Sequence, residues 1–479
     1  MSIRWLREAD VVVVGSGFSG LAAAIEAHDA GASVVVLEKR RAVGGNSVIA
    51  GGMYNTANQQ KQKALGIKDS TDFHFEQTLA GGDFRADPVK VRYMVDHAHE
   101  GWLWLEGMGV ELFKLLQAYG ALWPRSHAPK YKEKRAGAAI VAALRDQVRA
   151  RHIPVLLEHK VNGIYRPQSR GRVLGVEVKA KDGTFNLHVK KGLVLASGGF
   201  CADVEMRMRH DPRFDARFGT TCHRDSTGET LNQAQDIGAD VVGLDFIQSI
   251  GPSGPDARYV KPPVGTVSLF NNLMRRIGGV TVQYCIYTDL RGRRIVASDA
   301  RRDQITEAVM RTPEKVCVGI SDDAGRKKAA HGETSLQKLR SLMQLHPEQL
   351  FVGQTIRELA QRIGMPDPAS LERTVSIYNA CVDAKNDPEF GQLPHNLAWK
   401  CEKPPFWATT ASPALHYMCG GLRTNGVSTQ VVDRWNRVIP GFYAAGEITG
   451  GVHGTNRLGG NATTDCIVFG RLAGREAAS

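Results

Sequence analysis

The chain has 479 residues, of which 42% are hydrophobic and 23% are charged, and its 61 basic and 49 acidic side chains give a net charge of +12. This composition is that of a folded globular protein and excludes a disordered chain, a collagen and a coiled coil. No apolar run approaches the 18 residues of a membrane-spanning helix, and the basic charge predicts attraction to anionic ligands.

Residues 10–14 read Asp-Val-Val-Val-Val, and the four valines are an apolar, β-branched run typical of a buried parallel strand. They are followed by the motif Gly15-Ser16-Gly17-Phe18-Ser19-Gly20, an alanine-rich helical pattern to residue 30, and a second strand over 33–37. This order predicts one β-α-β unit. The segment before residue 10 lacks a secretory leader pattern, so a cytoplasmic location is expected.

The glycines of the motif have separate roles in a dinucleotide-binding turn. Gly15 permits the tight turn, Gly17 lets the backbone approach a pyrophosphate, and Gly20 lets the helix pack on the strand. The helix N-terminus offers N–H donors to phosphates, and Glu38, at the end of the second strand, can accept from ribose hydroxyls. The alternative, a glycine-rich turn without a ligand, is disfavoured by the complete β-α-β context.

Two further features favour FAD over a nicotinamide cofactor. A second glycine pair, Gly44-Gly45, comes shortly after Glu38 and fits an extended dinucleotide approached again near its flavin end. A late strand over 441–447 ends in Glu447, which can reach a ribitol or ribose hydroxyl.

The remaining elements suggest a two-part domain with an insertion. The pattern predicts helices over 91–108 and 138–151, an antiparallel meander over 154–190, a buried strand over 192–199, a helical segment over 355–384 and a terminal helix reaching residue 478. Irregular Pro/Gly-rich stretches and short strands begin near residue 245. The predicted domains are a first part over 1–244, an inserted domain over 245–411 and a second part over 412–479.

Several stretches resemble the fumarate reductase and succinate dehydrogenase flavoprotein superfamily, most closely the soluble flavocytochrome fumarate reductases and urocanate reductases. The strongest is GEITGGVHGTNRLGGNATTDCIVFGRLAG at 446–474, supported by GGNSVIAGGMYN at 44–55, WPRSHAP at 123–129, LVLASGGF at 193–200 and HYMCGGL at 416–422. The resemblance covers nearly the whole chain. It implies an α/β fold, with a Rossmann-like, GR2-type FAD-binding domain and an inserted α+β capping domain that closes over the flavin.

The resemblance also implies roles for three side chains. Arg457 matches the arginine that binds the substrate carboxylate, a task suited to the bidentate guanidinium fork, and His416 matches a histidine at the same end of the substrate. Arg302 falls on the proton-donating arginine, with Arg301 as the alternative one residue earlier. Arginine is a poor acid by its ordinary pKa, so this role requires a proton relay in a dry site.

Motif and resemblance together predict the site residues. The predicted catalytic residues are Arg302, His416 and Arg457, and the predicted substrate-binding residues are Arg457, His416, Gly460, His127 and Tyr287. The predicted cofactor-binding residues are Gly15, Gly17, Ser19, Gly20, Glu38, Lys39, Gly45, Asn46, Ser47, Gly51, Gly52, Val161, Ala196, Ser197, Gly198, Gly446, Glu447, Asn461 and Ala462. No metal site is predicted, because the eight cysteines include no CxxC pair.

Three departures from the family pattern affect the expected chemistry. The run over 247–252 lacks the substrate-binding histidine of the reductases, and the run over 277–281 has no carboxylate where they carry a Glu-x-x-Arg relay. A four-carbon diacid is therefore a less favoured substrate, and the proton route stays open, with Tyr284, Tyr287 and His127 as substitutes. Asn46 lies where membrane-bound relatives carry a flavin-linking histidine, which indicates non-covalent FAD.

The sequence therefore predicts an FAD-dependent oxidoreductase that transfers a hydride between the flavin and a C–C bond next to a carboxylate. It would act as a 2-enoate reductase or as the reverse acid dehydrogenase or desaturase. The alternatives are an amino-acid oxidase of the aspartate-oxidase type, a desaturase of a cyclic oxo-carboxylic acid, and a non-catalytic FAD-binding assembly or RNA-binding protein. The expected partners are a small anionic carboxylic acid and an external electron donor or acceptor, with no nucleic acid and no membrane span.

Overall fold

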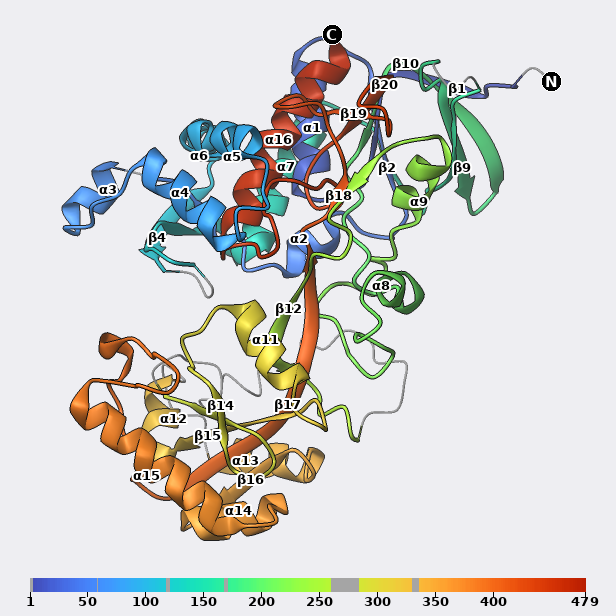
Figure 1. Cartoon of the computed structure of the whole chain (residues 1–479). Coiled ribbons are helices and arrows are strands. Elements are labelled where there is room, and N and C mark those ends of the chain that lie inside the picture. Colours follow the sequence, from blue (N-terminus) through green and yellow to red (C-terminus); the bar gives the residue numbers. More distant parts are fainter. Residues whose placement is uncertain (1–2, 58, 118–120, 168–170, 260–283, 330–335) are drawn as a thin grey trace. The chain divides into compact units, whose positions relative to one another are not determined.

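The computed structural model describes residues 3–57, 59–117, 121–167, 171–259, 284–329 and 336–479 (Figure 1). They form two compact units with separate hydrophobic cores. The first unit comprises Met1–Asp211, Asp225–Ile247 and Tyr417–Ser479, and the second comprises Pro212–Arg224 and Gln248–His416. The bounds predicted for the inserted domain, 245 and 411, each lie a few residues before the positions where the chain enters the second unit after Ile247 and leaves it after His416. The sequence pattern does not separate residues 212–224 from the first part.

The main sheet of the first unit has the strand order β19-β20-β10-β1-β2-β7. Its strands are β1 (Arg7–Val14), β2 (Val34–Glu38), β7 (Val155–Leu157), β10 (Gly183–Leu195), β19 (Gln430–Val432) and β20 (Val438–Ala444). From β20 to β7 the neighbours pair in parallel, whereas β19 is antiparallel to β20. The predicted strands over 10–14 and 33–37 are confirmed as β1 and β2.

Three helices pack together beside this sheet. Helix α1 (Phe18–Asp29) connects β1 to β2 and packs against α16 (Asn461–Ala478) and α7 (Ala136–Ala150). The helices α1 and α16 pack so closely that a Cβ at Gly474 of α16 would lie 2.2 Å from the Ala23 carbonyl oxygen. Burial on both faces explains why residues 11–14 of β1 are all valine.

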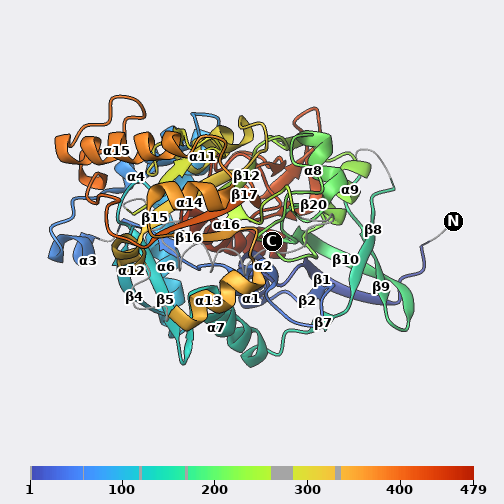
Figure 2. The same ribbon diagram turned by 90° about the horizontal axis from the view of Figure 1, so that it is seen from below.

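An antiparallel meander extends the sheet. Strand β8 (Lys160–Tyr165) pairs with β9 (Gly175–Ala180), and β9 pairs with the beginning of β10 (Figure 2). The meander predicted over 154–190 is confirmed, except that β7 is parallel to β2. A small two-stranded sheet joins β11 (Val241–Val242) to β18 (Gly421–Leu422).

The first unit also contains a helical layer and a second small sheet. The helices are α2 (Gly45–Ile49), α3 (Gln59–Ala64), α4 (Thr71–Gly81), α5 (Pro88–Asp96), α6 (Ala98–Gly107), α8 (Val204–His210) and α9 (Glu229–Asp236). The sheet is built from β3 (Tyr54–Asn55), β4 (Glu111–Leu116), β5 (Ser126–Tyr131) and β6 (Lys134–Arg135). The single helix predicted over 91–108 is wrong, because His97, with φ −94° and ψ 0°, separates α5 from α6.

The second unit is built on a sheet of order β12-β17-β15-β13-β14, with β16 also on β17. Its strands are β12 (Ile247–Gly254), β13 (Ile286–Thr288), β14 (Arg294–Val296), β15 (Cys317–Asp322), β16 (Leu350–Gly353) and β17 (Phe406–Met418). Its helices are α11 (Arg302–Met310), α12 (Asp323–Ala329), α13 (Leu336–Leu345), α14 (Ile356–Ile363), α15 (Pro368–Ala384) and the short 3-10 helix Pro394–Asn396. The segment predicted over 355–384 divides because Gly364, with φ +84°, ends α14 and Pro368 begins α15. Within the described ranges, no helix has the length and apolar character needed to cross a bilayer.

Candidate active site

The turn from β1 into α1 leaves no room for a side chain at Gly15 or at Gly20. Gly15 has φ +103°, and a Cβ there would lie 2.4 Å from the Ala196 carbonyl oxygen at the end of β10. A Cβ at Gly20 would lie 2.0 Å from the Gly15 carbonyl oxygen. Both positions therefore require glycine, for the turn and for helix–strand packing.

Glu38 is fixed at the end of β2 by the neighbouring turn. Its Oε2 accepts hydrogen bonds from the backbone N–H of Ser16 at 3.1 Å and from Ser16 Oγ at 2.5 Å. Its Oε1 accepts from the backbone N–H of Arg40 at 2.9 Å. Ser16 Oγ also accepts from the Gly44 N–H at 3.1 Å, so the acid, the first glycine motif and the second glycine pair form one rigid edge.

The same edge fits a dinucleotide. Helix α1 begins without a side-chain cap and without an acidic residue in its first turn, as expected of a phosphate-binding helix N-terminus. A Cβ at Gly45 or Gly51 would meet no atom within 4 Å, and one at Gly17 would meet only Ser47 Oγ, at 3.1 Å. The backbone is therefore open to close approach at three of the predicted cofactor-binding glycines.

Lys39 is held by an acid that the sequence interpretation missed. Its Nζ donates to Thr227 Oγ1 at 3.0 Å and to Glu229 Oε2 at 2.9 Å. Burial favours the protonated form of Glu229, but hydrogen bonds from Thr227 and Lys39 outweigh it and lower the pKa of Glu229 to about 2. The Lys39 ammonium is therefore paired with a carboxylate in the first unit.

Glu447 lies partly buried beyond the end of β20. Burial raises the pKa of its carboxyl group, although the backbone N–H groups of Met418 and Gly199, the charge of Arg457 and the Asn46 amide act in the opposite direction. The Met418 N–H donates to Glu447 Oε1 at 3.2 Å, and Asn46 Nδ2 also donates to Ser226 Oγ at 3.0 Å. This partly buried carboxyl group is the acceptor that the sequence predicts for a sugar or ribityl hydroxyl.

The other predicted cofactor-binding residues all belong to the first unit. Val161 is in β8 and accepts from Gln233 Nε2 through its carbonyl at 3.2 Å. Ser197 Oγ is 2.5 Å from Thr230 Oγ1, and Gly198 has φ +80°. Close packing also favours glycine at Gly52, where a Cβ would lie 2.4 Å from the backbone N of Gly137, and at Gly446, where it would lie 2.2 Å from the Ser19 side-chain Oγ.

Helix α16 begins at a second uncapped N-terminus, fixed by buried amides. Asn461 Oδ1 accepts from Asn55 Nδ2 at 2.7 Å and lies 2.9 Å from His74 Nε2, while Asn461 Nδ2 donates to Thr78 Oγ1 at 3.0 Å. Asn461 and Ala462 form the first turn, which has no acidic residue. Because the Asn461 side chain is used within the protein, the backbone of this turn is the part that can face a cofactor.

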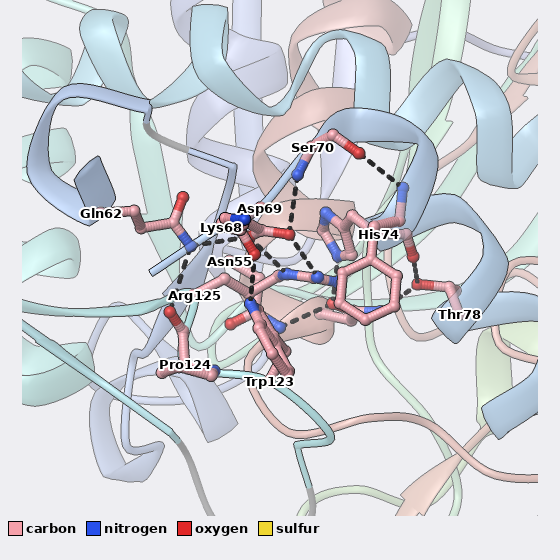
Figure 3. A network of polar contacts seen from close by, with 12 residues as sticks. Asn55, Gln62, Lys68, Asp69, Ser70, His74, Thr78, Trp123, Pro124 and Arg125 are labelled. Carbon is pink, nitrogen blue, oxygen red and sulfur yellow. Dashed lines mark hydrogen bonds and ion pairs between the residues drawn. The ribbon is translucent and has the colours of Figure 1, made fainter. Parts of the chain in front are cut away.

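The network continues into a buried ion pair (Figure 3). Arg125 Nη2 lies 2.6 Å from Asp69 Oδ1 and Nε lies 3.0 Å from Oδ2, and the two side chains are 3% and 0% exposed. Gln62 Nε2 donates to Asp69 Oδ2 at 2.6 Å, and Ser126 Oγ donates to Asn55 Oδ1 at 2.6 Å. Of this network only Asn461 was predicted, although WPRSHAP and GGNSVIAGGMYN contain Arg125, Ser126 and Asn55.

Arg457 lies in a buried aromatic and acidic cluster of the first unit. Its guanidinium carbon is 4.9 Å from the centre of the Tyr417 ring, and its Nη1 donates to the Leu458 carbonyl at 2.9 Å. Tyr417 Oη is 3.5 Å from His453 Nε2, which is 3.4 Å from Asp465 Oδ2. Gly460, at the N-cap of α16, has φ +91° and would place a Cβ 2.0 Å from Asn55 Oδ1.

Arg302 and His416 belong to the second unit. Arg302 is the first residue of α11 and is 6% exposed. Arg301 Nη2 instead pairs with Asp303 Oδ2 at 2.5 Å, with both side chains partly exposed, so Arg302 is the more buried of the two candidates. His416 Nδ1 lies 2.6 Å from Thr221 Oγ1.

Two predicted substrate contacts lie in protein cores. The His127 ring has no accessible surface and stacks on Trp102 with a centroid distance of 4.5 Å, and burial lowers its pKa to about 4. Tyr287 is 2% exposed and lies in a core cluster with Val296 and Ile305. Because side chains this buried can reach a substrate only if the core opens, we leave both out of the proposed site. The run over 277–281 lies outside the described residues.

Comparison with known proteins gives a consistent result. Residues 10–463 match the family described as FAD binding domain. The probable fumarate reductase Ifc3 of Shewanella frigidimarina is 32% identical over 98% of this chain and 74% of its own length. The urocanate reductase of Eggerthella lenta is also 32% identical, over 98% of this chain and 75% of its own. The open conformation of a flavocytochrome c3 fumarate reductase superposes with a TM-score of 0.77 at 30% identity, covering 99% of this chain and 78% of that one.

Proposed function

The chain belongs to the FAD binding domain family and is an FAD-dependent oxidoreductase, and from this premise we propose that it reduces the C=C bond of a 2-enoic acid. Bound FAD, once reduced by an external donor, would supply the hydride for one alkene carbon, and the other carbon would take a proton. The observation that carries the proposal is the buried Arg457 in the glycine-rich turn before α16.

Arg457 binds the substrate carboxylate. The guanidinium is held by Tyr417 and by the Leu458 carbonyl, so little conformational entropy is lost when it binds an anion. A carboxylate held at two oxygens places the adjacent double bond at a fixed distance and angle, which is the main catalytic effect of such a contact. His416, oriented by Thr221, is a second contact for the same end of the substrate.

Arg302 delivers the proton. Its position at the buried start of α11 keeps it away from bulk water, whereas Arg301 is engaged with Asp303. A proton moved from an arginine must be replaced at once, so the side chain acts as a relay member rather than as a free acid. Turnover also requires an external electron donor, since each reduction consumes one hydride.

The cofactor is held without a covalent bond. Glu38, the turn from Gly15 to Gly20 and the first turn of α16 hold the FAD, and Asn46 contributes an amide already bonded to Ser226. An amide is not a nucleophile toward the flavin ring. Acid precipitation of the protein should therefore release intact FAD into the supernatant, and retention of yellow colour in the pellet would contradict the proposal.

Anaerobic reoxidation of the reduced flavin tests the reaction. The holoenzyme is photoreduced and mixed with urocanate, acrylate or fumarate while the return of flavin absorbance is recorded. At least one enoate should restore the oxidised spectrum, and removal of the carboxylate anchor in Arg457→Ala should lower kcat/KM at least 100-fold, equivalent to about 3 kcal/mol.

Arg423→Ala is the matched control. Arg423 pairs with Asp240 at 3.2 Å and is 38% exposed, so its removal should change kcat/KM less than threefold. Equal activity in Arg457→Ala and the wild type would overturn the assignment. Bleaching of the oxidised flavin by a saturated acid, with acid-dependent reduction of an artificial acceptor and no reoxidation by any enoate, would reverse the proposed direction.

A further inference from the structure

Lys90 on α5 is a buried lysine that has no part in the reaction proposed above. Its side chain lies in the first unit, where α5 packs against α4 and α16. The residue is 3% exposed, and its Nζ donates to the Gly450 carbonyl at 3.2 Å. Among the described residues, this carbonyl is the only hydrogen-bond acceptor of the ammonium, and no carboxylate lies at ion-pair distance. Because an ammonium has three N–H donors, these surroundings leave two of them without an acceptor.

Lys90 faces the beginning of the turn that ends in the carboxylate-binding arginine. We call residues 450–457 the anchor turn. Next to the Lys90 contact, the Asp87 N–H donates to the Gly451 carbonyl at 2.7 Å, and a Cβ at Gly451 would lie 3.4 Å from Lys90 Nζ. Near the other end, Asn456 Nδ2 donates to the last carbonyl of α4 at 3.0 Å. The start of α5 and the end of α4 therefore hold the anchor turn at both ends, and the ammonium is part of this support.

Charged groups on three segments act on the Lys90 ammonium. Asp87 at the N-cap of α5 and the buried Asp465 on α16 attract it, whereas Arg423, which follows β18, repels it. Burial outweighs the two carboxylates and lowers the pKa of Lys90 to about 8. The side chain is therefore mainly charged at pH 7 and mainly neutral above pH 9.

An anion bound by the anchor turn would favour the charged form of Lys90. Asp465 does not serve Lys90 alone, because its Oδ2 also lies 3.4 Å from Nε2 of His453, a residue of the anchor turn. A substrate carboxylate at Arg457 adds a further negative charge to this buried region, where charges interact more strongly than in water. By linkage, binding that favours the protonated form of Lys90 is itself favoured by that proton.

We propose that Lys90 is a positioning residue that couples carboxylate binding to the uptake of a proton. Its ammonium holds the anchor turn at Gly450 and stabilises the anion bound by Arg457. When Lys90 is neutral, binding draws one proton from the solvent onto Nζ, and release of the ligand returns it. The inference rests on the proposed function, because it takes Arg457 as the group that binds the substrate carboxylate.

Ligand binding to the oxidised holoenzyme tests the coupling without turnover. The flavin spectrum is titrated with acrylate, 3-phenylpropionate and succinate between pH 7 and pH 9.5, and the ligand that binds most tightly is kept. For a tenfold coupling, the wild-type Kd should rise about sevenfold across this range. Calorimetric titration at pH 8.5 in two buffers of different ionisation enthalpy should show uptake of about half a proton per bound ligand.

Three variants separate the charge of Lys90 from its packing. Lys90→Met retains most of the side-chain volume without the charge, so it should bind the ligand at least fivefold more weakly than the wild type at pH 7, with a Kd that does not vary up to pH 9.5. Lys90→Arg stays charged and should keep the tight binding of pH 7 over the whole range. Lys130→Met, at a lysine that is 43% exposed, is the control and should keep the wild-type pH profile.

The outcomes distinguish the role of Lys90 from the proposed reaction. A wild-type Kd that does not change with pH, while Arg457→Ala abolishes binding, would overturn the role of Lys90 and leave the carboxylate anchor in place. Absence of proton uptake by the wild type would also overturn it, and this measurement needs no variant. A pH dependence that Lys90→Met removes, in a protein whose reduced flavin no enoate reoxidises, would support Lys90 and overturn the proposed reaction.

Discussion

His74 shows how one buried side chain can couple a site to pH. Its Nε2 lies 2.9 Å from Asn461 Oδ1, an oxygen that already accepts from Asn55, so the histidine is the hydrogen-bond donor. The residue is 1% exposed, and burial is the main cause that lowers its pKa to about 3. A neutral imidazole is therefore built into the support of α16.

The lowered pKa predicts a specific loss of stability in acid. Above about pH 6.5, the ordinary histidine pKa, the ring is neutral in both folded and unfolded chains and contributes no pH dependence. As the pH falls from 6.5 toward 3, only the unfolded chain takes up the proton, so the free energy of unfolding decreases, by about 2 kcal/mol at pH 5. Urea denaturation at pH 7 and pH 5 should show this decrease in the wild type and a smaller one in His74→Gln.

Above pH 7 the unfolding free energies of the two proteins should run parallel, since His74 is neutral in both states there. A His74→Gln protein with the full acid sensitivity of the wild type would show that other groups account for it. His127, whose pKa burial lowers to about 4, acts in the same direction and remains in both proteins.

At two places in the site, the sequence does not determine which of two adjacent residues makes the contact. The motif around 416–422 brings His416 to attention, but strand alternation separates it from Tyr417, which contacts Arg457. The resemblance favours Arg302 and leaves Arg301 as the alternative one residue earlier, and the start of α11 shows that Arg302 is the more buried. Side-chain direction depends on local backbone geometry, which a motif spacing does not specify.

At the scale of elements, the start of α16 depends on segments distant in the chain. Asn55 from β3 and His74 and Thr78 from α4 bond Asn461, and the nearby Arg125–Asp69 pair anchors the loop before β5 (Figure 3). None of these contacts follows the local helical or strand period. The arrangement explains how the first turn of α16 and the Arg457 turn can hold a fixed position.

Removal of one partner of the ion pair should be costly. Asp69→Asn leaves the buried Arg125 charge without its counter-ion, so we expect the unfolding free energy to fall by about 3 kcal/mol. Chemical denaturation of the wild-type and Asp69→Asn holoenzymes measures this difference in unfolding free energy. Asp72→Asn is the control: its partner is Arg92 and its side chain is 83% exposed, so the loss should stay within about 1 kcal/mol. Equal losses in both variants would contradict a special role for the buried pair.

At the scale of the whole molecule, the two units have separate cores, and only the first holds the predicted cofactor-binding residues. The core of the first unit includes Val11, Leu21 and Ile467, and that of the second includes Ile320, Leu359 and Tyr378. Every predicted cofactor-binding residue lies in the first unit. FAD binding should therefore stabilise one part of the molecule selectively.

Differential scanning calorimetry of the apoprotein and holoprotein tests this selectivity. We expect two transitions, of which FAD raises only the one that belongs to the first unit. At a free FAD concentration of about 100 times Kd the gain is about 2.7 kcal/mol. Trp399 and Trp407 lie in the second unit and Trp102 and Trp104 in the first, so single-tryptophan variants can assign the transitions. An equal rise of both transitions would contradict a cofactor site confined to the first unit.

The sequence by itself determined the cofactor family and the parallel sheet. Gly15, Gly20, the valines of β1 and Glu38 are local requirements of turn geometry and burial, and they are readable because each acts within one β-α-β unit. Tertiary structure alone decided the support of Asn461, the partner of Lys39 and the neighbour of Arg457. These contacts join residues dozens to hundreds of positions apart. Their geometry depends on how the packed elements meet, and no local period or spacing encodes that.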